Sequence, residues 1–225
     1  GCYTNIGTIA IALDALNINK PTRFNLTVCI GRIINFYPIW VYPQVTPICP
    51  KDIYETEHLD DRAKSVLEAG GKVYLTPSAE KDTLPSSIKT QFSTDFWSVG
   101  TFAKQEGAMG QLIDVNHPIF ENFPTEFHTN WQWWAMATQR AAIMPKQYKA
   151  IITEIDCYAF LRPMVQLIEC RCGKGKLVFS TLGLQNLQRH PEARALLNAI
   201  YLYMDSDRFE PENDIDIEEM ERLVK

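Results

Sequence analysis

The stretch "DIYETEHLDDRAKSVLEAGGKVYLTP", residues 52–77, decides the fold class because it combines strand and helix patterns. Its two apolar ends, "DIYET" and "KVYLTP", predict buried strands. The middle is amphipathic, with an apolar face formed by Leu59, Ala63, Val66 and Leu67. Gly70 or Gly71 supplies the left-handed residue that ends a helix. A strand, a helix and a strand with short joints form a βαβ unit, so we expect a parallel sheet covered by helices.

The C-terminal part continues with clear patterns. The runs "PMVQLIECR" and "KLVFSTL" predict two strands joined by a hairpin turn over residues 172–175. "PEARALLNAIYLYM" predicts a helix that begins at Pro191, and "DIDIEEMERLVK" predicts a short one at the end. Residues 78–160 mix aromatic and turn residues and give no assignment.

The first 43 residues favour β structure instead. In "TRFNLTVCI", apolar and polar residues alternate as in a half-buried strand, and "GTIAIAL" and "FYPIWVYP" predict two more strands. Three strands rarely form a stable sheet alone, so we interpret this segment as the end of a β-sandwich. The predicted organisation is sandwich strands and linker over residues 1–45, an α/β domain over 46–210 and an acidic tail over 211–225. Because the chain opens at Gly1 without a signal peptide, we expect the polypeptide to begin upstream.

Composition excludes several function classes. The 225 residues carry a net charge of -5, which argues against a nucleic-acid partner. No apolar run approaches the roughly 20 residues that span a bilayer, so we expect no membrane span. The six cysteines and four histidines lack metal or redox spacing, so we expect no metal and no cofactor.

No pattern marks a catalytic residue. The sequence lacks a G-x-C-x-G or G-x-S-x-G elbow; Cys172 falls in the predicted hairpin turn, and Ser78 lacks flanking glycines. The "GKGK" run at residues 173–176 precedes a strand, whereas a phosphate loop precedes a helix. Glycosidases use two carboxylates about 5 to 10 Å apart. The carboxylate candidates are unspecific: Asp95, Glu106, Asp114, Glu126, Glu154 and Asp156.

Three of the five tryptophans fall in "FPTEFHTNWQWW", residues 123–134. If this segment is a strand, Trp131 and Trp133 share one face and Trp134 takes the other. Such rings could stack on sugars, which gives a candidate carbohydrate-binding set of Trp97, His128, Asn130, Trp131, Trp133 and Trp134. Large aromatic side chains also fill protein cores, so the cluster is either a ligand platform or core packing.

Several of these stretches together resemble a known family. "FWSVGTF", "MGQLIDVNHPIFENFPTEFHTNWQWW" and "GKGKLVFSTLGLQNLQRHPEARALLNAIYLYM" resemble the C-terminal region of bacterial glycoside hydrolase family 2 proteins of the β-galactosidase type. "YPIWVYP" resembles the end of the β-sandwich that precedes this region. The family's C-terminal region is similar to class I glutamine amidotransferases, which implies a flavodoxin-like three-layer α/β sandwich without the reactive cysteine.

The resemblance implies a role without catalysis. The family's catalytic glutamates lie on an upstream α/β barrel that this sequence does not contain, so no catalytic residue carries over. The chain is then an accessory module of a β-galactosidase-like enzyme that packs against upstream domains and contacts oligosaccharide, with homo-oligomerisation as a fold-level analogy. The family suggests a periplasmic or extracellular location. Two alternatives stay open: a stand-alone carbohydrate-binding module with a tryptophan platform, and a divergent amidotransferase-like hydrolase.

Overall fold

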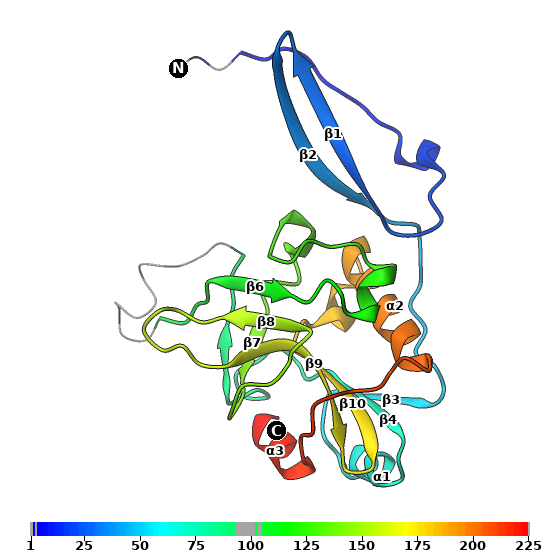
Figure 1. Cartoon of the computed structure of the whole chain (residues 1–225), viewed down its shortest axis with the longest axis vertical. Helices are drawn as coiled ribbons and strands as arrows, with labels where there is room; N and C mark the ends of the chain where they lie inside the picture. The colour runs from blue at the N-terminus through cyan, green and yellow to red at the C-terminus, as the bar shows by residue number, and fades with distance from the viewer. Residues whose placement is uncertain (1, 3, 93–101, 103–104, 225) are drawn as a thin grey trace.

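The computed structural model describes residues 2, 4–92, 102 and 105–224. A hairpin near the N-terminus, with the segment that leads into it, projects from a larger body formed by the described residues that follow the hairpin (Figure 1). Within the described ranges, no helix is long and apolar enough to cross a membrane.

The hairpin consists of β1 (Thr22–Ile30) and β2 (Ile33–Val41), which form an antiparallel sheet of their own. Ile30 faces Ile33 in the register, so the turn contains two residues, and Gly31 takes the left-handed conformation at φ +59°. The strand predicted from the alternation in "TRFNLTVCI" is confirmed. The third predicted strand, at residues 7–13, is wrong: this segment has no strand and leads into the 3₁₀ helix η1 (Leu13–Leu16).

The body is built on a mixed sheet that has eight strands in the described part of the chain. The strands are β3 (Ile53–Thr56), β4 (Lys72–Leu75), β5 (Ser87–Lys89), β6 (Gly110–Ile113), β7 (Arg140–Ile143), β8 (Ile152–Ile155), β9 (Met164–Cys172) and β10 (Gly175–Ser180). Their order is β3-β4-β10-β9-β7-β5, while β8 pairs with β9 and β6 pairs with β8. The molecule is therefore a mixed α/β protein rich in β-strands.

Only part of this sheet is parallel, which corrects the expectation of a parallel sheet. The strands β3, β4 and β10 run parallel, and every other pair in the described sheet is antiparallel. The two-residue turn between β9 and β10 makes this pair antiparallel, because strands joined so tightly must run in opposite directions.

The predicted βαβ unit is confirmed around helix α1 (Asp61–Glu68). Asp60 caps the helix by accepting a hydrogen bond from the Ala63 N–H at 2.7 Å. Gly70 follows the helix at φ +86° and turns the chain back into β4. Capping and a left-handed glycine thus fix both ends of α1, as the sequence indicates.

Helices cover both faces of the body's sheet. On one face, α1 and α3 (Ile217–Leu223) share a core with Val73, Leu177 and Phe179. On the other, α2 (Pro191–Asp205) shares a core with Tyr74 and Val178. This second face also carries 3₁₀ helices at η2 (Pro118–Asn122), η3 (Trp131–Trp133) and η4 (Leu184–Leu187). Consecutive strand residues point to opposite faces, so each core takes alternate positions of β4 and β10.

The C-terminal segment packs onto the body. Ile215, Met220 and Leu223 are buried, and Arg171 and Asp214 form an isolated parallel bridge beside β9. The helix predicted in "DIDIEEMERLVK" is confirmed as α3. Residues 211–225 are therefore acidic on their exposed side, while their apolar side chains pack into the core that α1 also covers.

Candidate functional site

The tryptophan-rich segment is a 3₁₀ turn, so the strand alternation predicted for it is wrong. Asn130 begins η3 by accepting a hydrogen bond from the Gln132 N–H at 3.0 Å. Side chains three positions apart lie on the same side of such a turn. Trp131 and Trp134 therefore share one side, and Trp133 points the other way.

Trp131 and Trp134 form an aromatic shelf on the surface together with Phe92. The two indoles stack at 5.6 Å between centroids and 24° between planes, and Phe92 lies 5.1 Å from Trp131 and 4.8 Å from Trp134. Trp131 is 71% exposed and Trp134 is 53% exposed. The shelf is thus a preassembled apolar surface that solvent reaches.

Trp133, in contrast, belongs to the core. Its side chain is 0% exposed, its ring packs edge-on against Phe123 at 5.6 Å, and its Nε1–H donates to Thr125 Oγ1 at 2.9 Å. A ligand at the surface cannot reach this ring, so the prediction that Trp133 belongs to the carbohydrate-binding platform is wrong. Trp97, also predicted for the platform, lies outside the described residues.

The polar residues predicted beside the tryptophans are largely occupied. The Asn130 amide donates to Glu126 Oε2 at 3.0 Å, and its oxygen caps η3. Glu126 also accepts from Arg23 of the hairpin at 3.0 Å. His128 is exposed, and its Nδ1 lies 2.9 Å from the Thr129 carbonyl oxygen. Its Nε2 lies 4.0 Å from Glu126 Oε2, so both ring nitrogens have neighbours within the protein. Of the described members of the predicted set, Trp131 and Trp134 remain open to a ligand.

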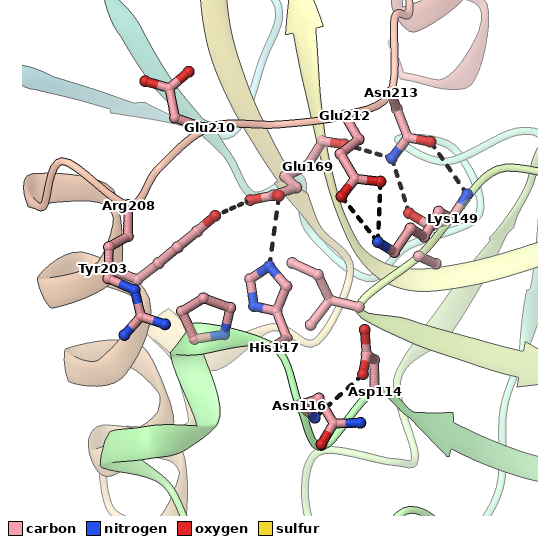
Figure 2. Close-up of a pocket in the computed structure, with 13 residues that line it drawn as sticks. Asp114, Asn116, His117, Lys149, Glu169, Tyr203, Arg208, Glu210, Glu212 and Asn213 are labelled. Carbon is pink, nitrogen blue, oxygen red and sulfur yellow. Dashed lines mark hydrogen bonds and ion pairs between the residues drawn. The ribbon is translucent and has the colours of Figure 1, made fainter.

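A second candidate site, which the sequence did not indicate, is a polar pocket of about 350 Å³ between η2, β9 and α2 (Figure 2). At its centre, Glu169 accepts a hydrogen bond from Tyr203 Oη at 2.7 Å and lies 3.5 Å from His117 Nε2. His117 Nδ1 accepts from the Ile119 N–H at 3.4 Å. Burial and the bond to Glu169 hold the pKa of Tyr203 above its usual range, so the hydroxyl stays a donor.

The polar groups of this pocket form a network. Both ring nitrogens of His117 and both carboxylate oxygens of Glu169 have neighbours within the protein, which links η2, β9 and α2. At the rim, Asn213 donates to the Glu169 and Lys149 carbonyl oxygens at 2.9 and 2.8 Å, and Lys149 pairs with Glu212. The pocket joins β9, η2, α2 and the C-terminal segment.

The family described as a domain of unknown function, DUF8487, matches residues 54–225. The chain belongs to this family. No curated protein matches the sequence at a significant level. The matched region of the DUF8487 domain contains the shelf and the polar pocket, whereas the hairpin precedes it.

The remaining carboxylates are dispersed or neutralised. Asp156 is clasped by Arg162, whose Nε lies 2.7 Å from Oδ2, and Glu106 pairs with Arg140 at 2.8 Å. Asp95 lies outside the described residues. Glu154 is buried in β8, and burial raises its pKa to about 8. Of the five candidate carboxylates that the structure describes, only Asp114 lines the polar pocket.

The described residues offer no metal centre, since no group of three His, Cys, Asp or Glu side chains among them is arranged to hold a metal ion. The six cysteines are free thiols, and Cys170 and Cys172 are buried in β9. A sequence signal for the polar pocket did exist. Glu169 is a carboxylate inside an apolar strand, and such a residue is almost never fully buried unless it is paired.

Proposed function

We propose that this chain is a non-catalytic accessory module of a β-galactosidase-like glycoside hydrolase and that it contacts carbohydrate through the aromatic shelf. The observation that carries the proposal is the exposed, stacked pair of Trp131 and Trp134 with Phe92 behind it. Large aromatic side chains are normally buried, and an exposed set held rigid before binding loses little entropy when a ligand arrives.

The chemistry of the shelf suits a sugar ring. The apolar faces of pyranoses pack against indole rings, and their hydroxyl groups need donors and acceptors at the edge. His128 and Glu126 stand next to the shelf in the sequence and are partly exposed to solvent. Polar groups from the same segment as the rings thus support the proposal.

The hairpin supports a role in packing against upstream domains. Its outer part carries exposed apolar side chains, namely Ile30, Ile33, Ile34, Phe36 and Tyr37. A two-stranded hairpin with such a surface is marginally stable alone and gains stability when another sheet covers it. This is the behaviour expected of the last strands of a sandwich domain.

We further propose that the body is a flavodoxin-like domain related to class I glutamine amidotransferases. The parallel strands β3, β4 and β10 and the helices on both faces support this relation. The hydrolase alternative has less support. Cys170 and Cys172 are buried, and burial together with Glu55 raises the pKa of Cys49 to about 12, which keeps that thiol protonated.

The test of carbohydrate contact is a binding assay of Trp131→Ala and Trp134→Ala against immobilised plant and bacterial polysaccharides. We expect each variant to lose about tenfold in affinity, taking as a guide the ~1–3 kcal/mol that the stacking of one nucleic-acid base on an aromatic side chain contributes. Phe160→Ala is the matched control, since Phe160 is an exposed aromatic residue outside the shelf. Equal binding by all four proteins would refute the shelf as a carbohydrate platform.

The accessory role is tested by activity. The purified chain is expected to leave aryl β-galactosides intact at any pH between 4 and 9. Hydrolysis that scales with the protein concentration and survives repeated purification would show that the chain is itself an enzyme.

A further inference from the structure

A cleft of about 280 Å³ opens where the hairpin meets the body. The hairpin contributes Pro38, Ile39 and Trp40 of β2 and the following Tyr42. The body contributes Trp131 and Gln132 of η3 and Glu192 of α2. One indole of the aromatic shelf, that of Trp131, thus also forms a wall of this cleft.

Two contacts fasten the hairpin to the body at this point. Arg23 donates to Glu126 Oε1 at 3.0 Å, and the Tyr42 ring stacks on Phe123 at 6.1 Å between centroids. Phe123 is fully buried in the core of the body. The Tyr42 wall of the cleft is therefore anchored on the core, which fixes its position before a ligand binds.

Three polar atoms of the cleft residues are buried without a hydrogen bond of good geometry among the described residues: Trp40 Nε1, Tyr42 Oη and Gln132 Oε1. The Tyr42 hydroxyl and the Gln132 amide lie close enough to interact with each other, whereas the Trp40 N–H has no such neighbour in the described part of the chain. Gln132 is 5% exposed, and its other amide atom donates to the Pro124 carbonyl oxygen at 2.9 Å, which orients the free oxygen. A buried polar group without a partner costs about 1–3 kcal/mol. The Trp40 N–H and the Tyr42–Gln132 pair therefore place unused hydrogen-bonding groups at one cleft, which a ligand can engage.

The chemistry of these groups defines the ligand. The Trp40 N–H is a donor, Gln132 Oε1 is an acceptor, and the Tyr42 hydroxyl can serve as either. Burial holds the pKa of Tyr42 above its usual range, so this hydroxyl keeps its proton. Glu192 adds a carboxylate in the first turn of α2. A neutral ligand with several hydroxyl groups and an apolar face matches this mixture of donors, acceptors and aromatic walls.

We propose that the cleft binds a single pyranose ring, the end residue of a saccharide whose next ring stacks on the aromatic shelf. The volume of about 280 Å³ lies just below the ~300–1,000 Å³ range of ligand pockets, which suits a ligand as small as one ring. Because Trp131 borders both the cleft and the shelf, the saccharide runs from Trp40 across Trp131 towards Trp134. This inference rests on the proposed carbohydrate contact and adds the position and size of its specific subsite.

The test measures binding by the full chain of the methyl glycosides of galactose, glucose and mannose and of the matching β-linked di- to tetrasaccharides. Ligand-observed NMR and calorimetry give the dissociation constants. We expect Tyr42→Phe and Trp40→Phe each to weaken the best methyl glycoside by about threefold to tenfold, since each removes one hydrogen bond. Trp134→Ala should weaken the tetrasaccharide and leave the methyl glycoside unchanged.

Tyr37→Phe is the matched control, because Tyr37 lies on the same strand with an exposed side chain outside the cleft.

The remaining outcomes separate the subsite from the proposed function. If the parent chain binds oligosaccharide, loses it in Trp134→Ala and keeps it in both cleft variants, the shelf stands and the cleft subsite is refuted. If the parent chain binds none of these saccharides, both proposals fail together.

Discussion

At the scale of single residues, neighbouring tryptophans have opposite roles. Trp131 and Trp133 are two positions apart, yet one is mostly exposed and the other is fully buried. The difference arises because η3 is a turn of 3₁₀ helix that Asn130 caps, so these two side chains leave it in different directions. Residue type alone does not assign them to core or surface.

Replacing Trp133 should damage the fold, and replacing Trp131 should not. We expect Trp133→Ala to lower the free energy of unfolding by about 3–5 kcal/mol, because it leaves a cavity beside Phe123. Trp131→Ala should change it by about 0.5 kcal/mol or less, as usual for surface positions. Urea unfolding followed by circular dichroism measures both, and equal losses would contradict the assignment.

Glu154 gives the protein a pH-dependent stability. It is buried in β8, its carboxylate oxygens have no hydrogen-bond partner among the described residues, and burial raises its pKa from 4.5 to about 8. The nearby Gly110 N–H lessens the shift. Between these values the unfolded chain has lost a proton that the folded chain retains. Stability is therefore greatest below about pH 4.5 for this group and falls as the pH rises towards 8.

Glu154→Gln should remove this loss. Each pKa unit corresponds to about 1.4 kcal/mol, so the variant should be more stable than the parent chain at pH 8 and close to it at pH 5. Thermal unfolding at the two pH values checks the sign. Glu68→Gln serves as the control, since Glu68 is exposed at the end of α1. A variant that is less stable than the parent at pH 8 would contradict the burial of an unpaired carboxyl group.

At the scale of elements, the β9–β10 turn touches the end of α1. Gly173 lies in the turn at φ +61°, and a Cβ atom on Gly175 would approach the Gly71 carbonyl oxygen and lie 2.9 Å from Leu67 Cα. Both obstacles are backbone atoms, which cannot move aside as a flexible side chain can. The glycines of "GKGK" thus have a steric role, in agreement with the hairpin predicted for this run.

Gly175→Ala is expected to destabilise the protein by about 1–3 kcal/mol, the usual cost of overpacking. Lys174→Ala, at the neighbouring turn position, should have little effect because its side chain is exposed. Chemical denaturation of both variants measures the difference. A neutral Gly175→Ala would show that α1 and β10 can separate without cost.

At the scale of the whole molecule, the hairpin presents apolar side chains to solvent. The hairpin forms its own sheet and adds no strand to the body, and five large apolar side chains at its outer part face solvent. Apolar surface of this kind promotes association with another sheet. In the isolated chain the available partner is a second copy.

We therefore expect the isolated chain to self-associate, with an average mass that rises with concentration in sedimentation experiments. Replacing Ile33 and Phe36 together by Lys should suppress this association, because two charges on the apolar surface oppose its burial. Leu202→Lys, at an exposed position on α2, is the control. Unchanged association in the double variant would place the interface elsewhere.

Much of the local structure could be predicted because its determinants are local. The alternation in β1, the amphipathic pattern and glycine stop of α1, and Pro191 at the start of α2 each act within a few residues. At residues 7–13, the local pattern does not determine the structure. This segment alternates like a strand, yet it forms none, because a strand also needs a pairing partner that the pattern does not contain.

The sequence by itself determined the local elements: the βαβ unit, the β9–β10 hairpin and the helices α2 and α3. The tertiary structure alone decided the order of the strands, the burial of Trp133, the His117–Glu169–Tyr203 network and the cleft beneath the hairpin. Periodicity and capping act between near neighbours in the chain, whereas these features join residues that are far apart in sequence. Tyr42 and Gln132 meet at one cleft only because the hairpin packs on the body, and no local pattern encodes that contact.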